Sequence, residues 1–281
     1  MRIEKKSKYS SASRLMLLSL FALFVLFPII YTITNSFMNA DEIAKYYAGD
    51  QQMMIHLIPD KFSLNAYYQM LFRRPDYLIK FWNSLSLTTF IVIGQVVISC
   101  LAGYSFAKFK FPCRDGIFFT LIILMMMPYQ VTLVSNYIVL DKMGLIGSYL
   151  AIILPAIFSP FGVFLMRQVI ATMPDEIIEA AKIDGANQFQ LLFKIVVPRN
   201  KGGIVALIIL SFIDNWNMVE QPLVFLDNKY KYPLSIFLSQ INQSEPALAF
   251  ACGVLAMVPV VLLFTFFEKE LIEGIGFSNL K

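Results

Sequence analysis

Apolar residues are concentrated in six long runs that are nearly free of charged residues. A membrane-spanning helix needs about 20 mostly apolar residues, and each of the six runs is long enough. The runs are Leu15–Thr34, Phe81–Ala107, Gly116–Leu140, Met143–Met166, Gly203–Leu226 and Pro246–Phe267. A short polar break at Asp141 and Lys142 separates the third run from the fourth. The pattern predicts an all-α integral membrane protein with six transmembrane helices.

The composition agrees with this pattern and excludes several classes of protein. Of the 281 residues, 58% are hydrophobic and only 15% are charged, whereas about 25% of residues are charged in an average soluble domain. This excludes a disordered chain, a soluble enzyme and a nucleic-acid-binding arm. Three cysteines and one histidine argue against a disulfide scaffold and a His/Cys zinc site. We therefore expect neither a metal nor a nucleic-acid partner.

The distribution of Lys and Arg predicts the orientation of the chain. With the N-terminus inside, 15 of these residues fall on the inner side and 8 on the outer side, which places both termini in the cytoplasm. The first run lacks a small-residue cleavage site and is longer than the apolar part of a signal peptide. We expect it to be an uncleaved helix, and residues 1–281 to form a single transmembrane domain with helix 15–34 at its periphery.

Two segments predicted to face outward are long enough to matter. In Asn35–Lys80 we expect a short amphipathic helix over residues 63–72, with Ser63 as its N-cap. The segment Asp227–Glu245 is polar and longer than a bare connector requires. We interpret this second segment as a functional loop.

The inner segment 167–202 is the most informative part of the chain. Pro174 suits the first turn of a helix, and Gly185 suits its C-terminal end because glycine readily adopts a left-handed conformation. Ala180 and Ala181 would permit another surface to approach this helix closely. We expect a second short helix over Gln188–Val196, capped by Asn187 and closed by Pro198. From these patterns alone, the helix pair is either an amphipathic connector on the bilayer or a docking element.

The same residues match a family signature. Glu179-Ala180-Ala181, three residues, Gly185, nine residues, Ile195, one residue and Val197-Pro198 follow the pattern EAA-x3-G-x9-I-x-LP. The only departure is Val197 in place of leucine. The sequence therefore resembles the permeases of ABC importers, in which this signature lies on the cytoplasmic side before the last two spans.

Other stretches resemble the carbohydrate-uptake group, which includes the smaller membrane subunit of the maltose transporter. They are Asn83-Ser84-Leu85, Ala107–Phe111, Met127–Val131, Leu154-Pro155, Trp216-Asn217 and Pro222-Leu223. The resemblance extends from the first span to the sixth. The tail, residues 269–281, departs from it because it lacks the Gly/Ala-rich ending of many of these subunits.

The resemblance implies a type I ABC importer permease (MetI-like) fold and a set of partners. These are a second permease subunit in a heterodimer, two ABC ATPase subunits and an extracytoplasmic solute-binding protein, assembled in the lipid of a bacterial cytoplasmic (inner) membrane. The chain has no G-x-x-x-x-G-K-[ST] phosphate loop. We therefore expect a transport subunit without enzyme activity or cofactors, with ATP and Mg on the partner ATPases. The resemblance assigns ATPase coupling to Glu179, Ala180, Ala181, Asp184, Gly185, Ile195 and Pro198.

Two further groups of residues are candidate sites. Asp214, Asn217 and Gln221 share a face at helical spacing, and ionisable groups inside spans usually face a cavity or the bundle interior. They either line the solute pathway or make structural hydrogen bonds. By analogy with the maltose system, Tyr230, Tyr232 and Gln240 are candidate contacts to the binding protein.

The resemblance implies import of a sugar or oligosaccharide by alternating access. An alternative is an acidic or non-sugar solute, such as glycerol phosphate or a uronate oligosaccharide. A pathway for such an anion should contain Lys or Arg, and the six runs contain neither. A membrane-embedded enzyme or a channel is a third interpretation. However, the only histidine lies in an outer segment, and a channel would not need the EAA element.

Overall fold

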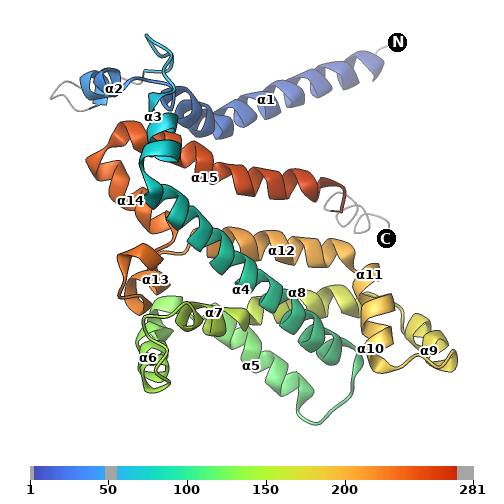
Figure 1. The fold of residues 1–281 in the computed structure, drawn as a ribbon. Coiled ribbons are helices and arrows are strands. Elements are labelled where there is room, and N and C mark those ends of the chain that lie inside the picture. The colour runs from blue at the N-terminus through green and yellow to red at the C-terminus, as the bar shows by residue number, and fades with distance from the viewer. Residues whose placement is uncertain (1–2, 48–55, 271–281) are drawn as a thin grey trace. The chain divides into compact units, whose positions relative to one another are not determined.

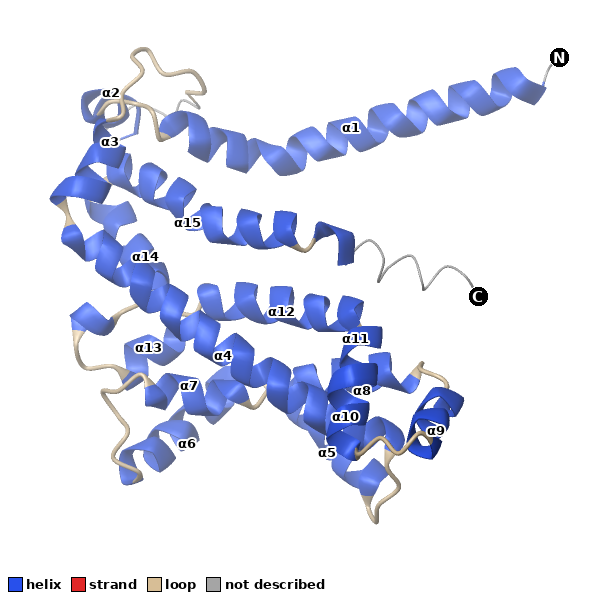
Figure 2. Ribbon diagram, turned by 45° about the vertical axis from the view of Figure 1, so that its right-hand side comes forward, coloured by secondary structure: helices blue, strands red, loops and turns tan. Residues whose placement is uncertain are grey.

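The described part of the protein, residues 3–47 and 56–270 of a computed structural model, consists of helices and turns with no strand (Figure 1, Figure 2). Four helical segments are long and apolar enough to cross a membrane. They are Ser13–Asn35, Pro75–Lys108, Leu150–Ala171 and Pro246–Phe266. Two bent pairs, Arg114–Met126 with Tyr129–Lys142 and Gln188–Arg199 with Lys201–Trp216, raise the number to six if each counts as one span. The all-α membrane fold is confirmed.

The chain divides into two compact units. The first comprises Met1–Leu78 and Leu238–Met257, and the second comprises Ile79–Phe237 and Val258–Lys281. The predicted single transmembrane domain stays a prediction. Three helices, α4 (Pro75–Lys108), α14 (Leu234–Ser244) and α15 (Pro246–Phe266), contribute residues to both units.

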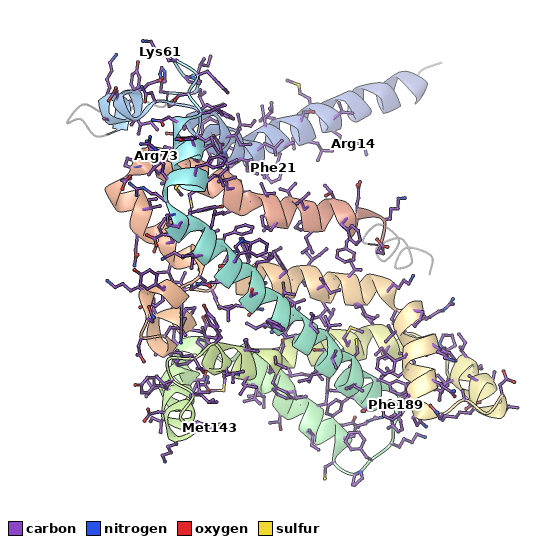
Figure 3. All side chains as sticks on the ribbon, in the orientation of Figure 1. Arg14, Phe21, Lys61, Arg73, Met143 and Phe189 are labelled. Atoms are coloured by element: carbon purple, nitrogen blue, oxygen red, sulfur yellow. The ribbon has the colours of Figure 1, made fainter. Side chains whose placement is uncertain are left out.

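The first unit contains one long helix and several short ones. They are α1 (Ile3–Asn35), α2 (Ala40–Tyr47), α3 (Asn65–Tyr68) and the π-helical turn Gln69–Arg73. The apolar stretch of α1 has no buried residue, and Figure 3 shows Phe21 among its projecting side chains. Such exposure suits a helix that faces lipid. The helix predicted over residues 63–72 begins at Asn65, whose N–H donates to the Ser63 hydroxyl at 3.3 Å.

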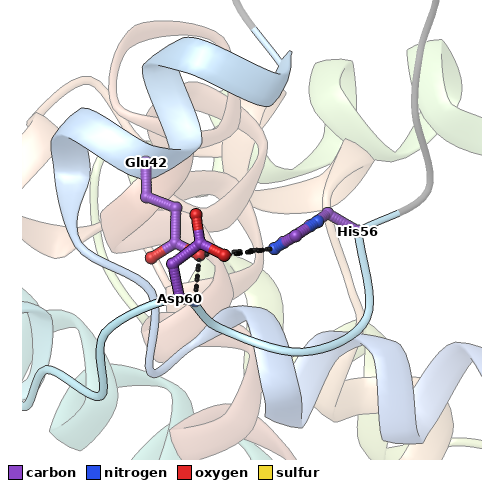
Figure 4. Close-up of side chains that lie close together, drawn as sticks. All are labelled: Glu42, His56 and Asp60. Carbon is purple, nitrogen blue, oxygen red and sulfur yellow. Dashed lines mark hydrogen bonds and ion pairs between the residues drawn. The ribbon is translucent and has the colours of Figure 1, made fainter.

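A cluster of Glu42, His56 and Asp60 joins α2 to the following segment (Figure 4). The buried Glu42 accepts a hydrogen bond from the Asp60 backbone N–H at 2.6 Å. The His56 Nε2 atom lies 3.5 Å from a carboxylate oxygen of each acid, and the Tyr46 ring stacks on the imidazole at 4.1 Å between centroids. Three side chains converge within the described residues, one fewer than the ligands of a structural zinc site. We interpret the cluster as a set of polar contacts that hold α2 against residues 56–60.

The second unit contains the remaining helices. They are α5 (Arg114–Met126), α6 (Tyr129–Lys142), α7 (Leu150–Ile157), α8 (Pro160–Ala171), α9 (Asp175–Ile183), α10 (Gln188–Gln190), the π-helical segment η2 (Leu191–Val196), α11 (Val197–Arg199), α12 (Lys201–Trp216), α13 (Glu220–Phe225) and the 3-10 turn η3 (Lys229–Lys231). Glycines allow close helix packing: a Cβ on Gly103 of α4 would lie 2.6 Å from the Met166 Cβ of α8. The Gln95 side chain of α4 donates to the Ala156 carbonyl of α7 at 2.6 Å, so a hydrogen bond joins these two helices.

Two predicted spans are broken. The third bends by 104° between α5 and α6, because Met127 precedes Pro128 and adopts an extended conformation with ψ of 129°. The fifth ends as a regular helix at Trp216, and α13 begins only at Glu220. Neither of these two predicted spans is therefore one continuous helix.

Two further boundaries differ from the predictions. The fourth span begins at Leu150 rather than Met143, because Gly144 and Gly147 take positive φ angles of 68° and 80° that interrupt a helix. The 227–245 segment, which was predicted as a polar loop, contains the helix α14. Leu234 and Ile236 of α14 are buried, and this apolar pair anchors the helix.

Candidate functional site

Helix α9 has a defined N-cap and a defined C-terminal turn. Pro174 is its N-cap, and the acidic residues Asp175 and Glu176 occupy the first turn, where they favour the helix dipole. Gly185 has a φ of 83° and ends the helix as predicted. Its N–H donates to the Lys182 carbonyl and the Ala186 N–H donates to the Ala181 carbonyl, both at 3.0 Å. This pair of bonds is a Schellman motif.

The second helix of the pair continues further than predicted. Asn187 caps α10 and forms a reciprocal capping box with Gln190, with both bonds at 2.9 Å. The helix then continues through η2 into α11 and ends at Arg199, so Pro198 does not close it. A π-helical turn changes the hydrogen-bond register ahead of the proline, which accommodates its missing N–H.

The inner faces of both helices are packed into one apolar cluster. Buried residues of α4, α8, α9, η2 and α12, together with Met173, contribute to it, and Ala181 and Ile195 pack against its margin. Its buried members are Cys100, Tyr104, Met166, Ile170, Met173, Ile178, Leu191, Leu192, Val196 and Leu207. The helix pair is therefore a rigid extension of the helix ends rather than a free loop.

The opposite face of α9 is exposed. Glu179, Ala180 and Ile183 share this face at helical spacing, while the buried Ile178 lies on the other side. Asp184, Gly185 and Pro198 are exposed as well.

Sequence reasoning missed three exposed apolar side chains near the EAA residues. Ile183 is 86% exposed, Phe189 of α10 is 71% exposed (Figure 3) and Phe193 of η2 is 57% exposed. Their signal in the sequence is an apolar residue at a position where the helical pattern requires a polar one. Exposed apolar groups next to small residues favour contact with another protein.

A lysine joins the end of α4 to the start of α9. The Lys108 amine donates to the Asp175 carboxylate and to the Met173 carbonyl, both at 2.6 Å. The hydrogen bond from Lys108 to the Asp175 carboxylate and the positive charge of Lys108 lower the pKa of Asp175 below its ordinary value.

The three candidate pathway residues do not lie on one continuous helix. Asp214 is exposed in the last turn of α12, Asn217 is the C-cap of that helix, and Gln221 lies on α13 after the break. The Asn217 side chain donates to the Ile213 carbonyl at 2.9 Å and caps α12. A role for these residues in lining the pathway stays a prediction.

The break in the fifth span presents a polar pair that sequence reasoning did not connect. The Gln130 side-chain amide donates to both carboxylate oxygens of Glu220, at 2.9 and 3.1 Å. Both residues are exposed in the isolated chain. They lie next to the bend between α5 and α6 and at the start of α13, respectively.

The candidate binding-protein contacts have different environments. Tyr230 and Gln240 are exposed, whereas Tyr232 packs against an apolar cluster. The Asn83 side chain donates to the carbonyls of Tyr230 and Tyr232 at 2.7 and 3.2 Å. Contact of these residues with a binding protein stays a prediction.

Four candidate spans and two bent helix pairs, with a partly exposed helix pair packed on α4, α8 and α12, define a multi-pass membrane protein of the permease class. The family model for the binding-protein-dependent transport system inner membrane component matches residues 95–272, and the chain belongs to this family. It is a transport subunit of an ABC importer with the type I, MetI-like fold.

Similar proteins cover almost the whole chain. The arabinooligosaccharides transport system permease protein AraQ of Bacillus subtilis is 30% identical over 263 residues, which are 92% of each chain. The sn-glycerol-3-phosphate transport system permease protein UgpE of Brucella abortus is 27% identical over 271 residues, 92% of this chain and 94% of its own. A crystal structure of a bacterial ABC transporter for the acidic polysaccharide alginate has a TM-score of 0.79 at 21% identity, covering 94% of this chain and 97% of that chain.

Proposed function

We propose that this chain is one of two different permease subunits of a bacterial sugar importer. Two ABC ATPase subunits would bind its inner side, and an extracytoplasmic solute-binding protein would deliver solute to its outer side. The chain would lie in the cytoplasmic membrane with both termini inside, and ATP and Mg would bind the ATPases. The family membership and the transport roles of AraQ and UgpE support this assignment.

The observation that carries the proposal is the exposed face of α9. Glu179, Ala180 and Ile183 lie on it, and Gly185 ends the helix. Small residues let a partner surface come close, and the exposed isoleucine would be buried on contact. The opposite face is packed into the apolar cluster, so a push on α9 would reach the helices behind it. Closure of the ATPase dimer would in this way rock the attached spans between inward-open and outward-open states.

A test of docking compares two exposed apolar positions. Ile183→Asp should abolish co-purification of the ATPase subunit with the permease pair, because it places a charge inside the proposed contact. Met143→Asp is the matched control, since Met143 is also exposed but lies in the turn after α6. Retention of the ATPase by the Ile183 variant at the wild-type level would overturn this docking face.

The proposed solute is a neutral sugar or oligosaccharide. The predicted spans contain no Lys or Arg, which an anion pathway would be expected to present. The second candidate is an acidic or phosphorylated solute, which the similarity to a glycerol-phosphate permease favours. Uptake of labelled arabinooligosaccharide and labelled glycerol 3-phosphate by cells that express the complete transporter distinguishes the two. Uptake of only the phosphate would overturn the first assignment.

A further inference from the structure

Lys108, the last residue of α4, connects two elements that are far apart in the sequence. Its amine donates to the Met173 carbonyl at 2.6 Å and to Asp175 Oδ1 at 2.6 Å. Met173 lies in the short link between α8 and α9, and Asp175 is the first residue of α9. One amine therefore holds both the link and the start of α9 to the end of α4.

The environment of Lys108 differs from that of an ordinary surface ion pair. Its side chain is only 8% exposed, whereas that of Asp175 is 76% exposed. An ammonium group removed from water needs hydrogen-bond partners that hold it in place. Here the backbone carbonyl supplies a partner whose position is set by the chain itself, and the carboxylate supplies the countercharge.

The neighbouring residues of α4 lead to the same helix pair. The Tyr104 hydroxyl, one turn before Lys108, lies 3.2 Å from the Gln188 side-chain oxygen at the start of α10. Gly103 packs directly against Met166 of α8. The end of α4 thus contacts α8, α9 and α10 through adjacent residues.

Helix α4 differs from α8 and α12 in how it is connected to the helix pair, and this difference makes the contacts of Lys108 important. The helix pair is covalently continuous with α8 and α12, so these two helices must follow any movement of it. Helix α4 has no such connection, because Lys108 and Asp175 are 67 residues apart. Apolar contacts between α4 and the pair are non-directional, whereas the two hydrogen bonds of Lys108 fix a distance and a direction.

We propose that Lys108 is a positioning residue that passes the movement of α9 to α4. This inference rests on the proposed function, since it assumes that α9 is moved by an ATPase. The proposal separates ATPase docking from the movement of α4, which docking alone does not. Loss of Lys108 should leave the ATPase bound and active while α4 no longer follows the helix pair.

The experiment uses the complete reconstituted transporter with its binding protein. Lys108→Met keeps most of the aliphatic stem and removes the charge and both hydrogen bonds. Lys108→Arg keeps a positive donor, and Lys110→Met is the matched control because it removes an exposed charge two residues away. Three quantities are measured: ATPase co-purification, binding-protein-stimulated ATP hydrolysis, and labelled sugar transported per ATP hydrolysed.

The expected result is a loss of coupling rather than of assembly. Sugar transported per ATP should fall about ten- to hundredfold in Lys108→Met, a range typical of losing hydrogen bonds to a charged group. Co-purification and hydrolysis should stay within about twofold of wild type, and Lys108→Arg should regain most of the transport. Unchanged transport in Lys108→Met would overturn the proposal, and so would a loss of transport that follows a loss of ATPase binding.

A second variant keeps the test decisive if Lys108→Met does not reach the membrane. Asp175→Asn changes an exposed side chain and leaves the bond to the Met173 carbonyl, so a smaller loss of coupling, about threefold, is expected. Unchanged coupling in that variant would then overturn the proposal. Failure of the wild-type chain to retain any ATPase would instead refute the proposed function, which separates the two failures.

Discussion

The left-handed conformation of Gly185 provides the sharpest test of the coupling element. Gly185 ends α9 with a φ of 83°, and two hydrogen bonds of 3.0 Å form the turn around it. A Cβ added there would meet no atom within 4 Å. A substitution therefore acts on this chain through backbone conformation alone, without a steric clash inside it.

The magnitude follows from the conformational preference of L-amino acids. A residue with a Cβ in the left-handed region costs roughly 1–2 kcal/mol, and Asn costs less because it tolerates this region. The undocked turn of Gly185→Ala can relax and escape this strain, whereas the docked turn must keep it. Since about 1.4 kcal/mol is a factor of ten in an equilibrium constant, Gly185→Ala should weaken ATPase docking by about 5- to 30-fold. Gly185→Asn should weaken it less, although Asn is larger than Ala.

The assay is the affinity of the purified permease pair for the ATPase subunit, measured by titration together with uptake of labelled sugar. The order Gly, then Asn, then Ala is expected, because the turn conformation decides the affinity. Gly185→Asp should abolish transport while the protein still reaches the membrane, since it adds a negative charge to the docking surface. Equal affinity of the Ala variant and the wild type would refute the reasoning. A stronger defect in Asn than in Ala would show that side-chain size at the contact, rather than backbone conformation, is what matters.

Three further outcomes are expected. Gly103→Ala should lower the melting temperature, because its Cβ would press on α8 at an energetic cost of about 1–3 kcal/mol, whereas Gly116→Ala should leave it unchanged or raise it because no atom lies within 4 Å. Gln95→Ala should destabilise the helix bundle by roughly 0.6–1.7 kcal/mol in thermal unfolding, because it removes the bond to the Ala156 carbonyl. The lowered pKa of Asp175 means that its ion pair contributes fully to stability above the ordinary value of 3.8 and loses this contribution as the pH falls through the lowered pKa. Unfolding measured from pH 7 to pH 3 should therefore show a loss at the acidic end that Asp175→Asn removes, and a loss near pH 6 would contradict this account.

The elements that could be predicted were those specified by local chemistry. Pro174, Gly185 and Asn187 each define a helix end through their own backbone or side-chain preference, and the structure places all three at those ends. The bend in the third span was missed although its cause, Pro128 after Met127, is local as well. The spans were predicted from hydropathy, which measures transfer into lipid and does not distinguish a straight helix from the 104° bend after Met127.

The candidate site shows the same division. The spacing of Glu179, Ala180 and Gly185 predicted the proposed coupling element without any coordinates. The exposure of Phe189 and Phe193 was missed, because apolar residues on an amphipathic segment are ordinarily expected to face inward, and only their position in the helical pattern departs from that expectation. The face shared by Asp214, Asn217 and Gln221 required a continuous helix, and the helix ends at Trp216.

The membrane environment of this protein, its helical class and the location of its EAA motif could be predicted from the sequence, because hydrophobic length, turn residues and motif spacing are local properties. The meeting of residues that are distant in the sequence is visible only in the folded protein. Lys108 and Asp175 are 67 positions apart, and no local preference of either residue specifies the other. Their contact exists because close packing of α4 on α8 brings the end of one helix to the beginning of α9. The physical reason is that partner choice depends on the packing of whole helices, whereas the formation of each helix depends on its own residues.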